Sequence, residues 1–298
     1  MHEEKSQLMT RDWNRKLDEL THKILEQNDS TSQAVIRLWK QCPKLHEQVV
    51  RSGTGLPLLK LWGLSRNIDD NTGTEIVASP ILEMLGALTN FPLQPPVLHA
   101  GIQHTYGYLF SLIDTPYGRK RDRWVQSYLE KSLGLKRPTF SPVVSDGTLL
   151  LNLTYFLGRV LFRGRPAEIS CLRRNRRFVD SELLKLNFRR LKCHRITEEL
   201  GNGPDRIRIV IDILSLSNSQ LPNPSNTENL DGLLIYGIEE VPSKRLSLIT
   251  TFPVSKETIE ELLNQPCGHR VEVQLKYNAF ANNIPREPLL GTRTIQLS

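Results

Sequence analysis

Sequence features that would assign a reaction are absent from this chain of 298 residues. It contains no GxGxxG, GxxxxGK[ST], HExxH or GxSxG motif, the short patterns that mark phosphate-binding loops, zinc sites and nucleophilic serines. It also contains no internal repeat and no low-complexity tract. The sequence therefore yields a fold class, a distribution of charge and a short list of candidate residues, and it specifies neither a cofactor nor an oligomeric state.

Cysteines and long apolar runs are also scarce. The cysteines are scattered without a CxxC pair and are expected to be unbridged, mostly buried thiols: Cys42, Cys171, Cys193 and Cys267. The longest apolar stretch, Thr148 to Gly158, is interrupted by Asn152 and is shorter than the about 20 residues needed to span a bilayer. Residues 1–20 are polar and lack the apolar segment of a signal peptide. We expect a soluble, cytoplasmic protein without a membrane partner.

What the chain does have is positive charge, concentrated in its middle third. The formal net charge is +7, yet residues 101–200 alone carry 19 basic and 9 acidic side chains. The excess is concentrated in three runs: Arg119, Lys120, Arg121 and Arg123; then Arg173, Arg174, Arg176 and Arg177; then Arg189, Arg190, Lys192 and Arg195. Such runs are often simply solvated surface, but a guanidinium matches phosphate or carboxylate oxygens better than an ammonium does. An anionic partner is therefore a working hypothesis.

Up to about residue 163, the spacing of apolar residues predicts helices. Trp13, Leu17, Leu20 and Ile24 lie on one helical face, and further helices are expected around 35–42, 81–88 and 102–113. A fifth helix is expected to begin at Asp114 or Thr115, with Pro116 in its first turn. A sixth, opened by Asp146 and apolar almost all round over residues 149–162, should be the central buried helix.

Beyond Pro166 the apolar residues alternate, which predicts antiparallel strands. We expect strands over residues 184–197, 206–216, 233–238, 246–252, 271–277 and 292–297, with a short helix at 256–263. The segment Ser217 to Asn229, rich in Ser, Asn and Pro, predicts a long, mobile loop open to proteolysis. The predicted fold class is α+β, with a helical domain at 1–165 followed by an antiparallel α+β domain with one short helix at 166–298.

One polar constellation could support acid–base chemistry. His104 and Tyr108 are four residues apart and share a helical face, and Asp114 follows one helix end later. Imidazole titrates near neutrality and arginine stabilises developing negative charge, so these three are the candidate catalytic residues. Arg119 and Arg123, together with Arg173 and Arg177, are the candidate substrate-binding residues.

Other constellations in the sequence indicate turns or core packing rather than chemistry. The loop carrying Asp69, Asn71 and Glu75 lacks the spacing of an EF-hand, so no metal site is predicted. His99 and His104 are five residues apart and do not share a helical face. Cys193 and His194 are adjacent in a predicted strand and point to opposite faces, which excludes a thiolate–imidazole pair.

Three function classes remain open. The first, which we favour because docking of the two domains would form a cleft, is a soluble enzyme acting on an anionic small-molecule substrate in that cleft through His/Tyr acid–base chemistry and Arg anion binding. The second is a nucleic-acid-binding or nuclease-like protein that uses the basic middle third on phosphates. The third is a non-catalytic interaction protein. Burial of His104 and Tyr108 would count against the enzyme and favour nucleic-acid binding.

Overall fold

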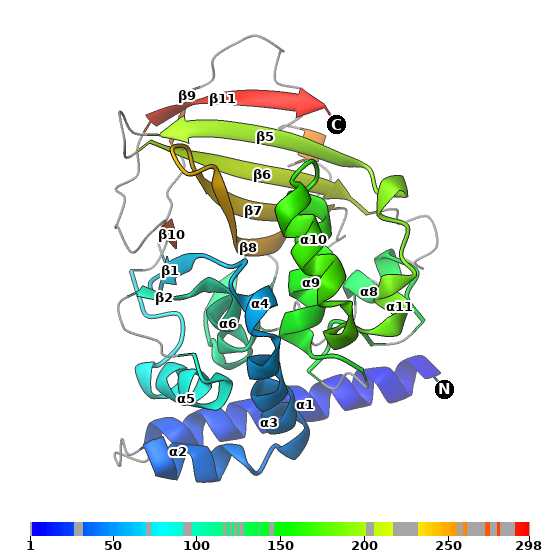
Figure 1. The fold of residues 1–298 in the computed structure, drawn as a ribbon. Coiled ribbons are helices and arrows are strands. Elements are labelled where there is room, and N and C mark those ends of the chain that lie inside the picture. Colours follow the sequence, from blue (N-terminus) through cyan, green and yellow to red (C-terminus); the bar gives the residue numbers. More distant parts are fainter. Residues whose placement is uncertain are drawn as a thin grey trace.

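The fold is that of a computed structural model (Figure 1). It describes residues 2–26, 32–69, 73–91, 97–115, 118–119, 121, 124, 128–136, 138–142, 146–200, 206–216, 232–254, 259–260, 272–274, 279–280 and 290–297. The predicted α+β class is confirmed: helices dominate the N-terminal half, and an antiparallel sheet follows. Figure 1 shows the sheet at one end of the molecule, α1 and α2 at the other, and α9 between them.

The described helices follow one another before the main sheet begins. The α-helices are α1 (His2–Glu26), α2 (Ser32–Trp39), α3 (Pro43–Ser52), α4 (Leu56–Leu59), α5 (Ser79–Thr89), α6 (Ala100–Thr105), α8 (Tyr128–Ser132), α9 (Leu149–Leu161), α10 (Pro166–Arg174) and α11 (Ser181–Leu184). The 3₁₀ turns are η1 (Gly53–Gly55), η2 (Gly107–Phe110), η3 (Arg176–Phe178) and η4 (Phe188–Arg190).

Most of the strands belong to one six-stranded antiparallel sheet. Its order is β8-β7-β6-β5-β11-β9, formed by β5 (Cys193–Leu200), β6 (Ile207–Ser215), β7 (Gly232–Glu240), β8 (Arg245–Val254), β9 (Glu272–Gln274) and β11 (Leu290–Leu297). A small sheet joins β1 (Leu64–Arg66) to β2 (Val97–His99) and β10 (Ala279–Phe280), and β3 (Asp114–Thr115) pairs with β4 (Gly118–Arg119).

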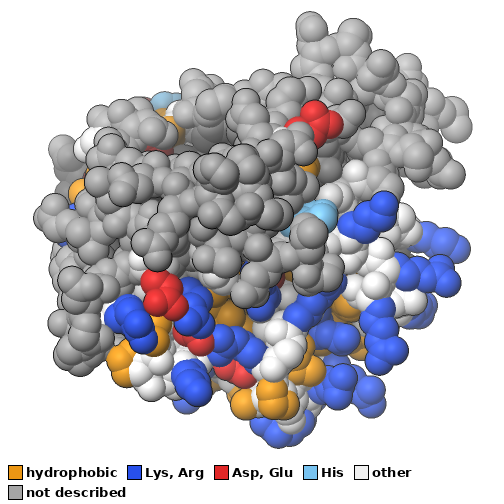
Figure 2. Space-filling model, turned by 90° about the horizontal axis from the view of Figure 1, so that it is seen from above, with side chains coloured by type: hydrophobic (Ala, Val, Ile, Leu, Met, Phe, Trp, Pro, Cys, Tyr) orange, Lys and Arg blue, Asp and Glu red, His pale blue; other side chains and the backbone are white. Residues whose placement is uncertain are grey.

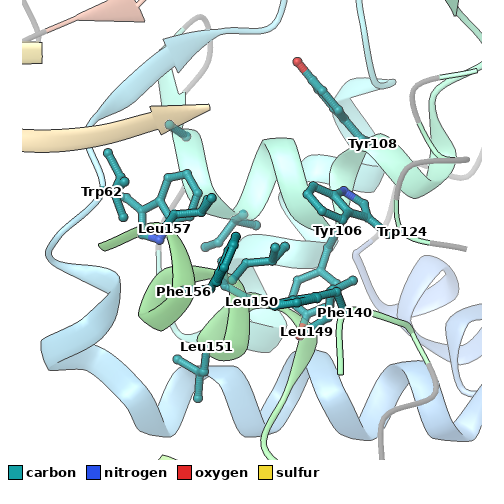
Figure 3. Close-up of a cluster of buried hydrophobic side chains, with 14 of the residues drawn as sticks. Trp62, Tyr106, Tyr108, Trp124, Phe140, Leu149, Leu150, Leu151, Phe156 and Leu157 are labelled. Atoms are coloured by element: carbon teal, nitrogen blue, oxygen red, sulfur yellow. The ribbon is translucent and has the colours of Figure 1, made fainter. Parts of the chain in front are cut away.

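Helix α9 is the central element, as its apolar sequence predicts. Thr148 caps its N-terminus, the Thr148 side chain accepting a hydrogen bond from the amide of Leu151 at 3.3 Å. Every residue from Leu149 to Leu161 except Arg159 is buried. Figure 3 shows Trp62 and Phe140 in the buried cluster together with Phe156 of α9. An amphipathic surface helix exposes one face, so burial on all sides identifies α9 as the core of the helical layer.

The two faces of the main sheet are both apolar. One face packs against α9 through residues such as Val210, Leu214 and Ile235, which belong to the same hydrophobic cluster as the helices. The other face carries a second cluster that includes Ile209, Ile211 and Tyr236, with Ile259 packed against it. Alternation along each strand therefore separates two cores rather than a core from solvent, which is why the strands read as nearly continuous hydrophobic runs.

The edge strand β8 is fastened to the helical part at Leu248. The amide of Leu248 donates to the carbonyl of Leu61 at 2.8 Å, and the amide of Gly63 donates to the carbonyl of Leu248 at 2.7 Å. Trp62 forms a parallel bridge at the same point. Residues 61–63 thus take up the outward-facing backbone groups of β8 at its middle.

Three sequence predictions differ from the structure. Residues 114–115 and 118–119 form the paired strands β3 and β4 instead of a helix start, since Asp114 pairs with Arg119 and Thr115 with Gly118. The predicted helix over 102–113 divides into α6 and η2. The predicted strand over 184–197 begins only at Cys193, since residues 181–190 form α11 and η4.

Two further predictions fall wholly or largely on residues outside those described. The loop Ser217–Asn229 lies outside them, and of the predicted helix at 256–263 only residues 259–260 are described, as helical. The domain boundary at 165 stays a prediction, although α10 packs against α9 and α4 in the helical layer. Among the helices that the structure describes, none is both long and apolar enough to cross a membrane.

Gly101 gives a direct test of how closely α6 packs on the core. A Cβ atom at this position would lie 2.6 Å from Cδ2 of Trp62, whose indole nitrogen donates to the hydroxyl of Thr154 at 2.8 Å. Gly101→Ala should lower the free energy of unfolding by about 1–3 kcal/mol because Trp62 must move. Urea denaturation measures this, with Gly107→Ala as the milder control, since its nearest contact would be 3.3 Å from Val77. Equal losses in the two variants would contradict the packing described.

Candidate nucleic-acid interface

The second and third basic runs lie on a short stretch of chain that wraps around α9. Helix α10 runs along α9, η3 contacts α9, and the ring of Phe188 in η4 lies 6.0 Å from that of Phe156 on α9. Eight exposed cations project from this stretch, and we call them the basic surface: Arg173, Arg174, Arg176, Arg177, Lys185, Arg189, Arg190 and Lys192. Figure 2 shows Lys and Arg side chains gathered along one side of the molecule.

Local sequence determines why the chain turns repeatedly here. Pro166 occupies the first turn of α10, where its missing N–H has no helical partner to lose. Asp180 caps α11, its side chain accepting from the amide of Glu182 at 2.8 Å. Asn187 caps η4 in the same way, accepting from the amide of Arg189 at 3.2 Å. These caps divide the stretch into short turns, and each turn projects cations outward.

Buried apolar side chains anchor the same turns from beneath. Leu172, Leu183 and Phe188 are all buried. Their burial orients α10, α11 and η4 so that the neighbouring basic residues face solvent. Apolar and basic residues alternate in the sequence of this segment. The same alternation is typical of a strand, and for this reason the sequence wrongly predicts a strand over residues 184–192.

Several neighbouring arginines have structural roles and do not belong to the basic surface. Arg163 donates to the carbonyls of Phe188 and Leu191 at 2.9 and 3.4 Å, and Arg165 forms an ion pair with Glu239 at 2.5 Å. The Arg159 guanidinium lies 4.7 Å from the ring centre of Phe188. These side chains hold the turns against α9 and the sheet.

The cations of the basic surface have few such roles. Arg173 and Arg174 lie in the last turn of α10, where positive charge suits the helix dipole, and Arg174 donates to the hydroxyl of Ser170 at 2.9 Å. Arg177 lies over the ring of Phe178, and Lys185 pairs with Glu182 at 2.6 Å. Of the eight, Lys185 alone has a carboxylate of the described residues within 4 Å. None of the other seven has such a carboxylate partner among the described residues.

Two arginines from the basic runs prove to be internal. Arg195 forms a bidentate ion pair with Asp212 on the neighbouring strand, at 2.8 and 2.7 Å, and also donates to the carbonyl of Leu161. Arg121, which is 3% exposed, forms a bidentate pair with Asp18 of α1 at 2.8 and 3.1 Å. Both arginines stabilise the fold, and neither is available to a large ligand.

The candidate catalytic histidine and tyrosine lie together, but in the core. The ring centres of His104 and Tyr108 are 4.9 Å apart, and each residue is only 6% exposed. Nδ1 of His104 lies 2.5 Å from the carbonyl oxygen of Ile249 in β8, a geometry in which the imidazole donates to the sheet. The indole of Trp124 donates to the carbonyl of His104 at 3.2 Å. Figure 3 places Tyr108 and Trp124 at the edge of the buried cluster. These contacts join α6 to the sheet.

The other members of the predicted enzyme site are described only in part. Asp114 and Arg119 are paired across β3 and β4. Arg123 lies outside the described residues. Arg173 and Arg177 are on the basic surface. The structure therefore unites two of the four candidate substrate-binding arginines with each other and does not show them beside His104.

His99 is a structural residue. Its Nδ1 accepts from the amide of Ile102 at 3.1 Å, which caps α6, and its Nε2 donates to the carbonyl of Leu59 at 3.0 Å. Burial lowers the pKa of His99 to about 4, so the ring is neutral near pH 7. Neither histidine of this region is thus placed as an exposed acid or base.

The remaining titratable candidates also have structural explanations. Burial raises the pKa of the Cys193 thiol to about 12, which makes it a poor nucleophile. Within the part of the chain that the structure describes, no group of three or more His, Cys, Asp or Glu side chains could hold a metal ion.

The sequence analysis missed one residue of the basic surface. Lys185 is the one cation of this surface that lies outside the basic runs of the sequence.

Comparison with known proteins adds no identification, because no family model, curated protein or solved structure matches this chain. The functional argument therefore depends on the geometry alone.

Proposed function

We propose that this protein binds nucleic acid through the basic surface, by contacts to phosphate groups. One observation carries the proposal. Seven cations on successive turns of residues 173–192 are exposed, and no carboxylate of the described residues lies within 4 Å of any of them. Six of the seven are arginines, whose planar guanidinium binds phosphate oxygens in a bidentate manner.

The arrangement suits a polymer better than one small anion. The cations project from α10, η3, η4 and the residue before β5, and each is exposed rather than directed at a common point. A chain of phosphates presents charge at regular intervals and can contact several turns at once. Extended positive potential also accelerates the encounter with such a polymer.

The amide side chains of this surface are already engaged, which favours contacts to phosphates over reading of bases. Asn175 donates to the carbonyl of Cys171 at 2.8 Å, and Asn187 accepts from the amide of Arg189. Asparagine is a usual partner of adenine edges, so its engagement in turns removes that option here. We expect binding with little sequence preference.

The competing proposal, an enzyme with an anionic small-molecule substrate, has less support. It requires His104 and Tyr108 to reach a substrate, whereas both are buried and His104 contacts β8. Nucleic-acid binding requires only groups that the structure shows to be exposed.

A salt series on one quadruple variant tests the proposal. In the wild type, the logarithm of the association constant should fall linearly with the logarithm of salt concentration, by about 0.9 per phosphate contacted on duplex DNA or about 0.7 on single strands. Replacing Arg173, Arg174, Arg176 and Arg177 by alanine should weaken binding tenfold or more near 0.1 M salt and flatten the slope by as much as ~3 units. Fluorescence anisotropy with a labelled 20-nucleotide duplex and single strand of random sequence measures both.

The control variant removes the same charge elsewhere. Lys23, Arg37, Lys40 and Lys44 are exposed on α1, on α2 and around the start of α3, at the end of the molecule opposite the sheet (Figure 1). Their replacement by alanine should leave the slope within about one unit of wild type. If the two quadruple variants lose affinity equally, binding follows net charge alone, and the basic surface is not the site.

A further inference from the structure

A buried side chain holds the middle of the basic surface from beneath. Asn152, in the first turn of α9, is wholly buried, and its side chain forms hydrogen bonds to backbone groups. Its amide nitrogen donates to the carbonyls of Thr139 and Asp146 at 2.9 and 3.4 Å, and its Oδ1 accepts from the amide of Asp180 at 2.9 Å. One side chain thus ties three separate segments to the central helix.

The space around this amide is closed. Gly147 has a φ of +68°, and a Cβ atom there would lie 2.5 Å from Oδ1 of Asn152 and 3.0 Å from the carbonyl oxygen of Phe178. The chain approaches Asn152 from both sides, so no larger residue fits between them. A closed site of this kind holds the surrounding backbone in one conformation.

The point that Asn152 fixes lies between the two halves of the basic surface. Asp180 follows Arg177 by three residues and precedes Lys185 by five, and its own side chain caps α11. Movement at residue 180 would change the spacing between the cations of α10 and η3 and those of α11 and η4. The rest of that linkage is short turns whose backbone hydrogen bonds are local, such as those from Val179 to Arg176 and from Leu184 to Asp180, and these bonds do not tie the segment to α9.

We propose that Asn152 is a positioning residue for nucleic-acid binding: by holding the amide of Asp180, it keeps both halves of the basic surface in one arrangement. This inference depends on the proposed function. A surface that is already ordered binds without an ordering cost, whereas a protein that samples the binding arrangement only part of the time shows an affinity reduced by that fraction. The number of cations does not change, so the salt slope should not change either.

Asn152→Ala is the test variant, and Thr154→Ala is its matched control. Thr154 is also wholly buried on α9, and its side chain accepts a hydrogen bond from Trp62 and donates one to the carbonyl of Leu150, neither of which belongs to the basic surface. Both variants should lose stability. Only Asn152→Ala should weaken binding of the labelled duplex and single strand, by about three- to tenfold at every salt concentration, with the slope unchanged.

Amide hydrogen exchange gives a readout that needs no ligand. In Asn152→Ala, exchange of residues 176–192 should accelerate relative to the rest of α9 and the sheet, and in Thr154→Ala it should not. Accelerated exchange without any binding by the wild type would refute nucleic-acid binding while leaving the role of Asn152 in ordering the segment intact. Unchanged exchange and unchanged affinity in Asn152→Ala would overturn the inference, as would equal loss of affinity in Thr154→Ala.

A second pair of variants serves if Asn152→Ala does not fold. Asp180→Pro removes the amide that Asn152 holds, and its φ of −56° already suits proline. Asp180→Ala removes the same carboxylate cap but keeps the amide. The proline variant should bind several-fold more weakly than the alanine variant at the same salt slope, and equal affinities would refute the role assigned to Asn152.

Discussion

Replacing Asp212 by alanine should lower the free energy of unfolding by about 3 kcal/mol, one of the largest losses expected from a single substitution in this protein. Asp212 is 1% exposed, and it holds both ends of the Arg195 guanidinium directly across the β5–β6 pair. Without the carboxylate, Arg195 keeps only its hydrogen bond to the carbonyl of Leu161, and a largely buried cation is left without its counter-charge.

A double-mutant cycle separates the free energy of the ion pair from the free energy of packing at the same positions. Asp212→Leu combined with Arg195→Met replaces the pair by apolar side chains, and most of the stability should return because no buried charge remains unpaired. Urea denaturation of the four proteins gives the coupling free energy. A loss below about 1 kcal/mol in Asp212→Ala would show that the pair is not a significant source of stability.

The second large effect is a dependence of stability on pH that arises from His99. Its pKa is about 4 in the folded protein against about 6.5 for a free imidazole, because the ring is fully buried and Nδ1 accepts from the amide of Ile102. Between these values the unfolded chain binds the proton and the folded chain does not. Stability is therefore complete above pH 6.5 and falls as the pH drops toward 4, by up to about 3 kcal/mol in total.

His99→Asn isolates this contribution. Asparagine retains an acceptor for the helix cap but cannot titrate, so the variant should be less stable than wild type at pH 7.5 and should lose less on acidification. The free energy of unfolding measured in urea at pH 7.5, 6.5, 5.5 and 4.5 gives the two curves. Their difference removes contributions from carboxylates common to both proteins. Parallel curves would mean that folding does not lower the pKa of His99.

The sequence predicted best those elements whose periodicity covers several turns or a full strand. Helix α9 was located to within a residue or two, because an apolar run of this length has few other solutions even with Asn152 inside it. Strands β6, β7 and β8 were located equally well, since each is a strongly apolar segment of nine or ten residues. Short turns such as α11 and η4 were missed, because caps at Asp180 and Asn187 override a two-residue alternation.

The candidate site shows a different limit of sequence reasoning. Charge counting located the basic runs but could not separate Arg195 or Arg121 from the exposed arginines. Their partners, Asp212 and Asp18, are 17 and 103 residues away in the sequence. The structural role of His104 likewise depends on a carbonyl 145 residues away, at Ile249. Such pairings arise from the topology of the chain and leave no local pattern.

The attachment of β8 to residues 61–63 has a consequence for behaviour at high concentration. An open sheet edge can recruit a strand from another molecule, and repeated recruitment leads to fibrils. Leu248 has already given both of its outward backbone groups to Leu61 and Gly63, so an incoming strand would meet an interruption halfway along this edge. Self-association by strand addition at β8 therefore requires residues 61–63 to detach first, which couples resistance to aggregation to the stability of the helical layer.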